Sequence, residues 1–213
     1  MNLLFATRNP GKLRELRRLV TGLDVRVVSL DDLAQELGRE IPEVEEDRST
    51  FADNAAKKAS EYARAAGMHA LADDSGLCID ALWGKPGIRS ARWSEDERPG
   101  LSGQDRDRAN NEKLVMVMQG VWPEHRGAEY RAVVALAGPD GSILASADGS
   151  CRGVIGEAPR GEGGFGYDPL FLPVGAPGKT MAELTPAEKD ALSHRGEALR
   201  RLLPELRRIS ANL

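Results

Sequence analysis

Cysteine is scarce in this sequence of 213 residues, which contains only Cys78 and Cys151. The two lie far apart, and neither has a second cysteine or a histidine at metal-ligand spacing, so the sequence favours neither a disulfide scaffold nor a zinc site. The chain also has no apolar run long enough to span a bilayer, and its first residues lack the pattern of a signal peptide. We therefore expect a soluble, cytoplasmic protein that does not bind a membrane.

A strong excess of charge of either sign is absent as well. The chain has 29 Lys and Arg against 33 Asp and Glu, a formal net charge of -4. This balance argues against bulk nucleic-acid binding, although it leaves room for a local basic pocket that binds a small anion. With 41% hydrophobic residues, residues 1–213 are expected to form a single domain, as one large unit or as two closely packed lobes.

A first candidate site is the loop Thr7-Arg8-Asn9-Pro10-Gly11-Lys12. Residues 2–6 before it predict a strand, and apolar residues at helical spacing from 13 to 20 predict an amphipathic helix after it. Such a loop offers free backbone N–H groups, the positive end of the helix dipole and the Lys12 ammonium, which together suit a phosphate group. The spacing of a P-loop is absent, and an ordinary strand-to-helix turn with a solvated lysine fits the segment equally well.

A second candidate site is the pair of aspartates Asp73 and Asp74, which follows the short apolar run 69–71. Two carboxylates at the end of a buried strand suit a metal ion better than they suit packing. Because adjacent strand residues point to opposite faces, only one of the two should face a cleft. The alternative is a turn in which the short polar side chains of residues 73–76 cap their own backbone.

An acidic segment between residues 40 and 47 forms a third candidate. Such a run is usually a solvated surface, and Pro42 disfavours a continuous helix through it. However, Glu45 or Glu46 could reach a metal ion shared with the aspartates, because Mg²⁺ is typically held by one or two carboxylates plus substrate phosphates.

The remaining segments predict a mixed α/β arrangement. Residues 25–28 predict a second strand in a parallel crossover, and Thr50 caps a helix that continues to Ala66 and ends at Gly67. Asn54, near the start of this helix, could bond a ligand or the backbone.

Further along the chain, residues 77–82 predict a strand that reverses direction and residues 105–118 predict a helix. Residues 130–137 and 142–147 flank the turn 138–141 and predict a hairpin. An antiparallel pair that joins the parallel strands makes the predicted sheet mixed.

The glycine-rich segment 161–169 interleaves Phe165, Tyr167 and Asp168 with glycines. Glycine lets the backbone approach a ligand closely and an aromatic ring can stack on a base, so this segment is a candidate base-binding loop. A turn whose aromatic side chains fill the core is an equally good interpretation. Thr185 then begins a capped helix that carries Lys189.

After that helix, residues 193–195 interrupt the helical pattern, and the leucines from residue 199 to 206 predict a last amphipathic helix. A histidine beside an arginine, as in His194-Arg195, is more often a surface pair than a site.

Taken in order, the motifs of the chain closely resemble those of the inosine triphosphate pyrophosphatase family. They are T-x-N-x-x-K (7–12), F-x-x-N-A (51–55), A-D-D-S-G (72–76), P-G-I-x-S-A-R (86–92), G-G-F-G-Y-D-P (163–169) and S-H-R (193–195). The resemblance covers nearly the whole chain. It implies an α/β fold in which an elongated mixed β-sheet separates two lobes, with the active site in the cleft between them, and it implies a homodimer.

The resemblance also implies roles for single residues. Asp74 would activate the attacking water, and Glu46 and Asp74 would bind Mg²⁺. The residues implied to bind substrate are Thr7, Arg8, Asn9, Pro10, Gly11, Lys12, Ser75, Phe165, Gly166, Tyr167, Asp168, Lys189, His194 and Arg195. Within this set, His194 and Arg195 would read the base.

The function that this resemblance implies is hydrolysis of the deaminated purine nucleoside triphosphates ITP, dITP and XTP to the monophosphate and pyrophosphate. Two other classes are weighed against it. A nucleotide-binding regulator without turnover would not need the acidic cluster. A phosphoryl-transfer enzyme such as a kinase would need an acceptor site and a recognisable phosphate motif, and the sequence has neither.

Overall fold

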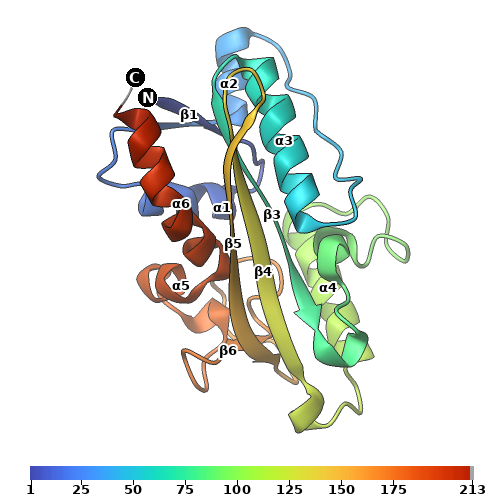
Figure 1. Ribbon diagram of the computed structural model, residues 1–213. Helices are drawn as coiled ribbons and strands as arrows, with labels where there is room; N and C mark the ends of the chain where they lie inside the picture. The colour runs from blue at the N-terminus through green and yellow to red at the C-terminus, as the bar shows by residue number, and fades with distance from the viewer. Residues whose placement is uncertain (212–213) are drawn as a thin grey trace. The chain divides into compact units, whose positions relative to one another are not determined.

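The structure, a computed structural model, describes residues 1–211 (Figure 1). Its six strands form one sheet in the order β2-β1-β3-β4-β5-β6. The strands are β1 Asn2–Phe5, β2 Arg26–Ser29, β3 His69–Ile79, β4 Gly127–Ala137, β5 Ile143–Ile155 and β6 Phe171–Pro173. β1 pairs in parallel with β2 and β3, whereas β5 pairs antiparallel with β6. The mixed α/β sheet expected from the sequence is therefore confirmed.

The helices are α1 Pro10–Leu19, α2 Leu30–Leu37, α3 Phe51–Ala66, α4 Gly103–Val117, α5 Pro186–Leu192 and α6 His194–Ser210. α3 has the predicted ends, because the Thr50 side chain accepts the N–H of Asp53 and Gly67 adopts a left-handed φ of 62°. α2 was not expected from the sequence. The reciprocal capping box of Ser29 and Asp32 at its start is the signal that could have predicted it.

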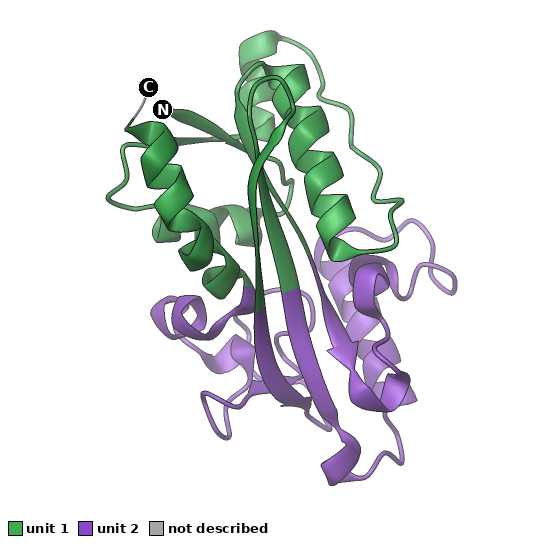
Figure 2. Ribbon diagram, in the orientation of Figure 1, with its two compact units in different colours: residues 1–74, 132–149, 195–213 green, residues 75–131, 150–194 purple. Residues whose placement is uncertain are grey.

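The chain divides into two compact units (Figure 2). Unit 1 contains residues 1–74 and 132–149 and the chain from 195 onward, and unit 2 contains residues 75–131 and 150–194. The boundary falls inside β3, β4 and β5, so each of these strands contributes residues to both units. The expected single domain with its site in a cleft stays a prediction.

In unit 1, helices cover both faces of the sheet. Alternate residues of a strand point to opposite faces and so meet different helices. Leu3 of β1 and Leu71 of β3 pack in the cluster that contains the apolar residues of α1 and α6. Their chain neighbours Leu4 and Ala72 pack in a second cluster with α2 and α3. In this part of β3, odd-numbered residues therefore face α1 and α6, and even-numbered residues face α2 and α3.

β3 runs straight through the two aspartates, which differs from the expectation that a strand ends there and a second one reverses direction. The extended backbone continues through Ser75 and Gly76 to Ile79. Gly76 is needed there, since a Cβ at this position would lie 2.3 Å from the carbonyl oxygen of Gly87. The turn interpretation of residues 73–76 is therefore wrong.

Unit 2 has a core of its own, centred on Leu77 and Ile79 of β3. Leu114 of α4, Tyr130 of β4 and Phe171 of β6 pack in the same cluster. The rings of Tyr130 and Phe171 meet edge to face, with their centroids 4.7 Å apart. The predicted helix of this unit is present as α4, and the predicted hairpin is present as the β4–β5 pair, whose turn at residues 138–141 belongs to unit 1.

Small side chains line the contact between α3 and the sheet. Four alanines of the sheet and three alanines of the helix are fully buried in one cluster: Ala70, Ala72, Ala135, Ala137, Ala55, Ala59 and Ala63. Because methyl groups face methyl groups, the helix lies close to the strands and no space is left for a longer side chain.

We predict that Ala59→Leu lowers the free energy of unfolding by about 1–3 kcal/mol, because the added carbons must push α3 away from the sheet. Urea unfolding measures this loss. Ala65→Leu is the matched control, since Ala65 lies on the same helix but is exposed. Equal stability of the two variants would show that the buried contact has room to spare.

Candidate active site

Asp74 points to the α3 side of β3, where it is 4% exposed. Its Oδ2 accepts a hydrogen bond of 2.9 Å from Nδ2 of Asn54, near the start of α3. The Oδ1 of Asn54 in turn accepts the backbone N–H of Arg48, also at 2.9 Å. Asn54 therefore bonds both the backbone and a site carboxylate, and it ties Asp74 to the segment that carries Glu46.

Lys58, one turn further along α3, supplies a positive charge to the same place. Its ammonium donates to the Glu46 carboxylate and, at 2.6 Å, to the backbone carbonyl of Asp73. Burial raises the pKa of the Asp74 carboxyl, Lys58 opposes this rise and the Glu46 carboxylate adds to it. Asp74 thus has more affinity for a proton than an ordinary aspartate, as a general base requires.

The donor chemistry around Asp74 fits a hard divalent cation. Within residues 1–211, no group of three or more His, Cys, Asp or Glu side chains is placed to hold a metal ion. The Glu46 carboxylate nevertheless adds to the rise in the Asp74 pKa that burial causes, so the two carboxylates lie near each other, and two carboxylates suffice for Mg²⁺ when phosphates complete its coordination. Of the two glutamates weighed for this role, Glu46 contacts Lys58, whereas Glu45 is exposed.

Asp73 points to the other side of β3 and is 1% exposed. Its Oδ2 lies 2.9 Å from Nζ of Lys12 and 3.0 Å from Nε of Arg195, and it forms an ion pair with each. Nη1 of Arg195 donates to the carboxylate of Glu15, which lies on α1. Two cations and two carboxylates therefore form one buried network that joins α1, β3 and the start of α6.

The network changes how its members titrate. Burial alone would raise the pKa of Asp73, but Lys12 and Arg195 hold that pKa well below its ordinary value of 3.8. Burial lowers the pKa of Lys12, an effect that Asp73 opposes and the nearby Arg195 strengthens. Asp73 is therefore a fixed anion and cannot serve as a base near neutral pH, unlike its neighbour Asp74.

The predicted phosphate loop is more fully bonded than expected. α1 already begins at Pro10, and Oδ1 of Asn9 accepts the N–H groups of Gly11 at 2.8 Å and Lys12 at 3.2 Å. Oγ1 of Thr7 accepts the N–H of Asn9 at 3.1 Å. The expectation of free N–H groups is therefore wrong for these three residues, because an asparagine at the N-cap satisfies the first turn itself.

Arg8 lies in the loop before α1, and Ser75 lies within β3. Arg8 donates to the backbone carbonyl of Ile41 at 2.6 Å and lies 3.4 Å from a carboxylate oxygen of Asp31. Ser75 follows Asp74 within β3 and is half-buried. Their substrate contacts stay predictions.

In unit 2, the glycine-rich segment forms a turn closed by Asp168. Its Oδ2 accepts the N–H of Phe165 at 2.9 Å and the Lys189 ammonium at 2.6 Å. The same ammonium lies 4.5 Å from the centroid of the Phe165 ring. A Cβ on Gly164 would come within 2.0 Å of Oδ2 of Asp168, so glycine here makes room for the carboxylate. The predicted residues Phe165, Asp168 and Lys189 are thus brought together.

Tyr167 and His194, two further candidates, are both buried and make different contacts. Tyr167 is 3% exposed and donates to the carbonyl of Ser90 at 2.8 Å, so this ring fills the core, as one of the two interpretations predicted. His194 is 7% exposed and stacks on Tyr130, with centroids 4.7 Å apart and an angle of 4°. The expectation that His194 and Arg195 form a surface pair is wrong, because the helix break at Ser193 turns both side chains inward.

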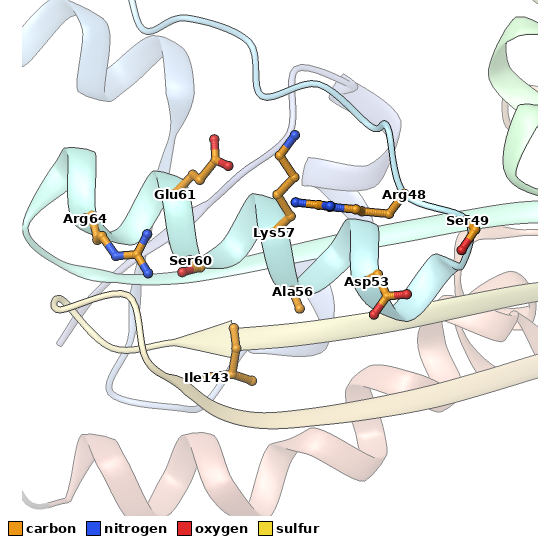
Figure 3. A pocket seen from close by; sticks show the side chains of 9 residues that line it. All are labelled: Arg48, Ser49, Asp53, Ala56, Lys57, Ser60, Glu61, Arg64 and Ile143. Carbon is orange, nitrogen blue, oxygen red and sulfur yellow. The ribbon is translucent and has the colours of Figure 1, made fainter.

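An open hollow of about 550 Å³ in unit 1 lies between α3 and the start of β5 (Figure 3). It is lined by Arg48, Ser49, Asp53, Ala56, Lys57, Ser60, Glu61, Arg64 and Ile143. No residue of the proposed site lies in this list, and the hollow carries charges of both signs. The hollow therefore contains none of the candidate residues, and Asp74 stays the predicted place of the chemistry.

Sequence reasoning missed two charged members of the site, Lys58 and Glu15. Lys58 follows Asn54 by four residues and lies beside the buried Ala59, so a lysine on the buried face of α3 was the available signal. Glu15 is 3% exposed, although the apolar spacing of residues 13–20 predicts that it lies on the polar face of α1. Its partner Arg195 lies 180 residues away in the chain, and no local pattern indicates such a pairing.

The comparison with known proteins defines the class. The Ham1 family matches residues 3–205, and the chain belongs to this family. The resemblance found in the sequence motifs is thereby confirmed. No helix within residues 1–211 combines the length and apolar character of a membrane span.

Individual relatives share the full length of the chain. It is 57% identical to a dITP/XTP pyrophosphatase of Anaeromyxobacter sp. (strain Fw109-5), with 99% of this chain and 98% of the relative covered. Among solved structures, a HAM1 protein from Coxiella burnetii has a TM-score of 0.79 at 35% identity, covering 97% and 98%. A nucleoside-triphosphatase / dITP/XTP pyrophosphatase from Mycobacterium abscessus has a TM-score of 0.70 at 45% identity, covering 96% and 100%.

We predict that Asp73→Asn lowers the free energy of unfolding at pH 7 by about 3–5 kcal/mol, because it leaves Lys12 and Arg195 buried without their shared anion. The pKa of Asp73 is lower in the folded than in the unfolded protein, so its ionised carboxylate stabilises the fold fully at a pH above the unfolded pKa of 3.8. This stabilisation declines as the pH falls toward the folded pKa. The free energies of unfolding of parent and variant, measured with denaturant, should therefore differ less below about pH 4 than at pH 7. A difference independent of pH would contradict the network.

Proposed function

We propose that this protein hydrolyses deaminated purine nucleoside triphosphates, dITP, ITP and XTP, to the monophosphate and pyrophosphate. The observation that carries the proposal is Asp74, a buried carboxyl with a raised pKa beside Glu46, in a chain whose full-length relatives are named dITP/XTP pyrophosphatases. A regulator without turnover has no comparable support.

In the proposed reaction, a water oxygen attacks the α-phosphorus and the bond from this phosphorus to the pyrophosphate oxygen breaks. Asp74 accepts the proton of the water, while Asn54 holds the Asp74 carboxylate in place. Glu46 and Asp74 would hold Mg²⁺, which when bound neutralises phosphate oxygens and lowers the pKa of a coordinated water. Lys12 would stabilise the charge that builds on the leaving group.

Two groups of residues are candidates for reading the base. Hypoxanthine and xanthine carry a 6-keto acceptor where adenine has an amino donor, so donors in the pocket favour the keto bases. Phe165 to Asp168 and Lys189 are the first candidates for this role. Arg195 is the second, because two of its donor groups already bond Glu15 and Asp73. A homodimer is a further proposal that rests on the family resemblance, and a cytoplasmic location is one that rests on the scarcity of cysteine.

Product analysis tests the function. With dITP as substrate we expect the monophosphate and pyrophosphate in equal amounts, whereas a kinase-like enzyme would give the diphosphate and a regulator would give no product. Asp74→Asn should reduce kcat by about 10²- to 10⁴-fold, because it removes the proposed base while keeping its shape. A variant as active as the parent would remove Asp74 from the mechanism.

Metal dependence is tested by chelation. We expect turnover to stop in excess chelator and to return with added Mg²⁺. Glu46→Gln should raise the Mg²⁺ concentration needed for half-maximal activity, and Glu45→Gln is the matched control because its side chain is exposed. Full activity after thorough chelation, or equal Mg²⁺ requirements of the two variants, would argue against the proposed ligands.

A further inference from the structure

Two polar residues of α4 hold the backbone of Gly166 from both sides. The N–H of Gly166 donates to Oδ2 of Asp107 at 2.8 Å, and Nδ2 of Asn111 donates to the Gly166 carbonyl at 2.8 Å. Asp107 and Asn111 are four residues apart and so lie on one face of the helix. One helix face therefore fixes both polar groups of a residue in the glycine-rich turn.

The orientation of the Asn111 amide is determined by its partners. Nδ2 also donates to the carbonyl of Asp107 at 2.8 Å, and because both acceptors are carbonyl oxygens, only the NH₂ group can face them. Its Oδ1 is buried and has no hydrogen-bond partner among residues 1–211. An unpaired buried acceptor is unfavourable, so Asn111 holds the turn at the expense of its own hydrogen bonding.

The turn needs such an anchor because its backbone is unusual. Gly164 and Gly166 have φ values of 76° and 62°, a region that glycine enters without steric strain but does not prefer strongly. Between them lies Phe165, whose N–H and ring meet Asp168 and Lys189. A shift of Gly166 would therefore move the ring and the carboxylate that are proposed to meet the nucleoside.

We propose that Asp107 and Asn111 are positioning residues for base selection. They hold the turn 165–168 in the shape that accepts a deaminated purine, and loss of either bond loosens this shape without altering the groups around Asp74. The inference rests on the proposed function and assigns its substrate selectivity in part to α4.

The test compares four variants with the parent. Asp107→Ala removes the acceptor for the Gly166 N–H, and Asn111→Asp replaces the donor to its carbonyl by a repelling oxygen. Asp107→Asn keeps an acceptor oxygen and should restore the parent's behaviour. Asn110→Asp is the matched control for damage to the buried face of α4, because the Asn110 amide bonds the carbonyls of Ser90 and Ala91 and not Gly166. The Ser90 carbonyl also accepts the Tyr167 hydroxyl, so this variant shows what loosening Tyr167 does while both bonds to Gly166 remain.

The readouts are the ratio of kcat/KM for dITP to that for dGTP, the Kd of deoxyinosine monophosphate by calorimetry, and the melting temperature. Asp107→Ala and Asn111→Asp should lower the ratio and weaken monophosphate binding by about tenfold each, the scale of one buried hydrogen bond. Inhibition by pyrophosphate should stay unchanged. Asn110→Asp should lower the melting temperature and leave the ratio as in the parent.

An unchanged ratio in both disruptive variants, or an equal loss for dITP and dGTP, overturns the inference. If Asp107→Ala does not fold, Asn111→Asp against Asn110→Asp decides alone. The proposed function fails separately, since in that case the parent itself would release no pyrophosphate from dITP.

Discussion

The candidate site depends on the alternation of side chains along β3. Asp73 and Asp74 are neighbours in sequence, yet one meets Lys12 and Arg195 and the other meets Asn54 and Lys58. Their pKa values are therefore moved in opposite directions, down for Asp73 and up for Asp74. A one-residue change of register in this strand would exchange the two environments, so the parallel pairing of β3 with β1 is a condition of the chemistry.

Much of the fold could be predicted from local patterns. The cap at Thr50, the stop at Gly67 and the hairpin at residues 138–141 are short-range signals, and the structure contains each of them. The continuity of β3 could not be predicted, because Asp-Asp-Ser-Gly has the composition of a turn. It is extended only because sheet neighbours and the close approach of Gly87 to Gly76 require it, and neither is visible in the sequence.

The candidate site, like the fold, could be predicted only in part. The opposite directions of Asp73 and Asp74, and the gathering of Phe165, Asp168 and Lys189, were foreseen from periodicity and from family motifs. Side chains paired across long stretches of chain were not, since Glu15 and Arg195 each look like ordinary surface residues in their own helices. By contrast, Asn9 followed by Pro10 is a local helix-start signal, and it could have shown that Asn9 would occupy the N–H groups of the loop thought to hold phosphate.

The charges named on the two sides of β3 do not balance in the same way. Lys12 and Arg195 match Asp73 and Glu15, two cations against two anions, so that side is neutral. On the other side Lys58 faces Glu46 and Asp74, so among these three named charges one cation stands against two anions. Cations are therefore drawn to the Asp74 side of the strand, while the two groups stay coupled across it, because Lys58 lowers the pKa of Asp73 and Lys12 lowers the pKa of Asp74.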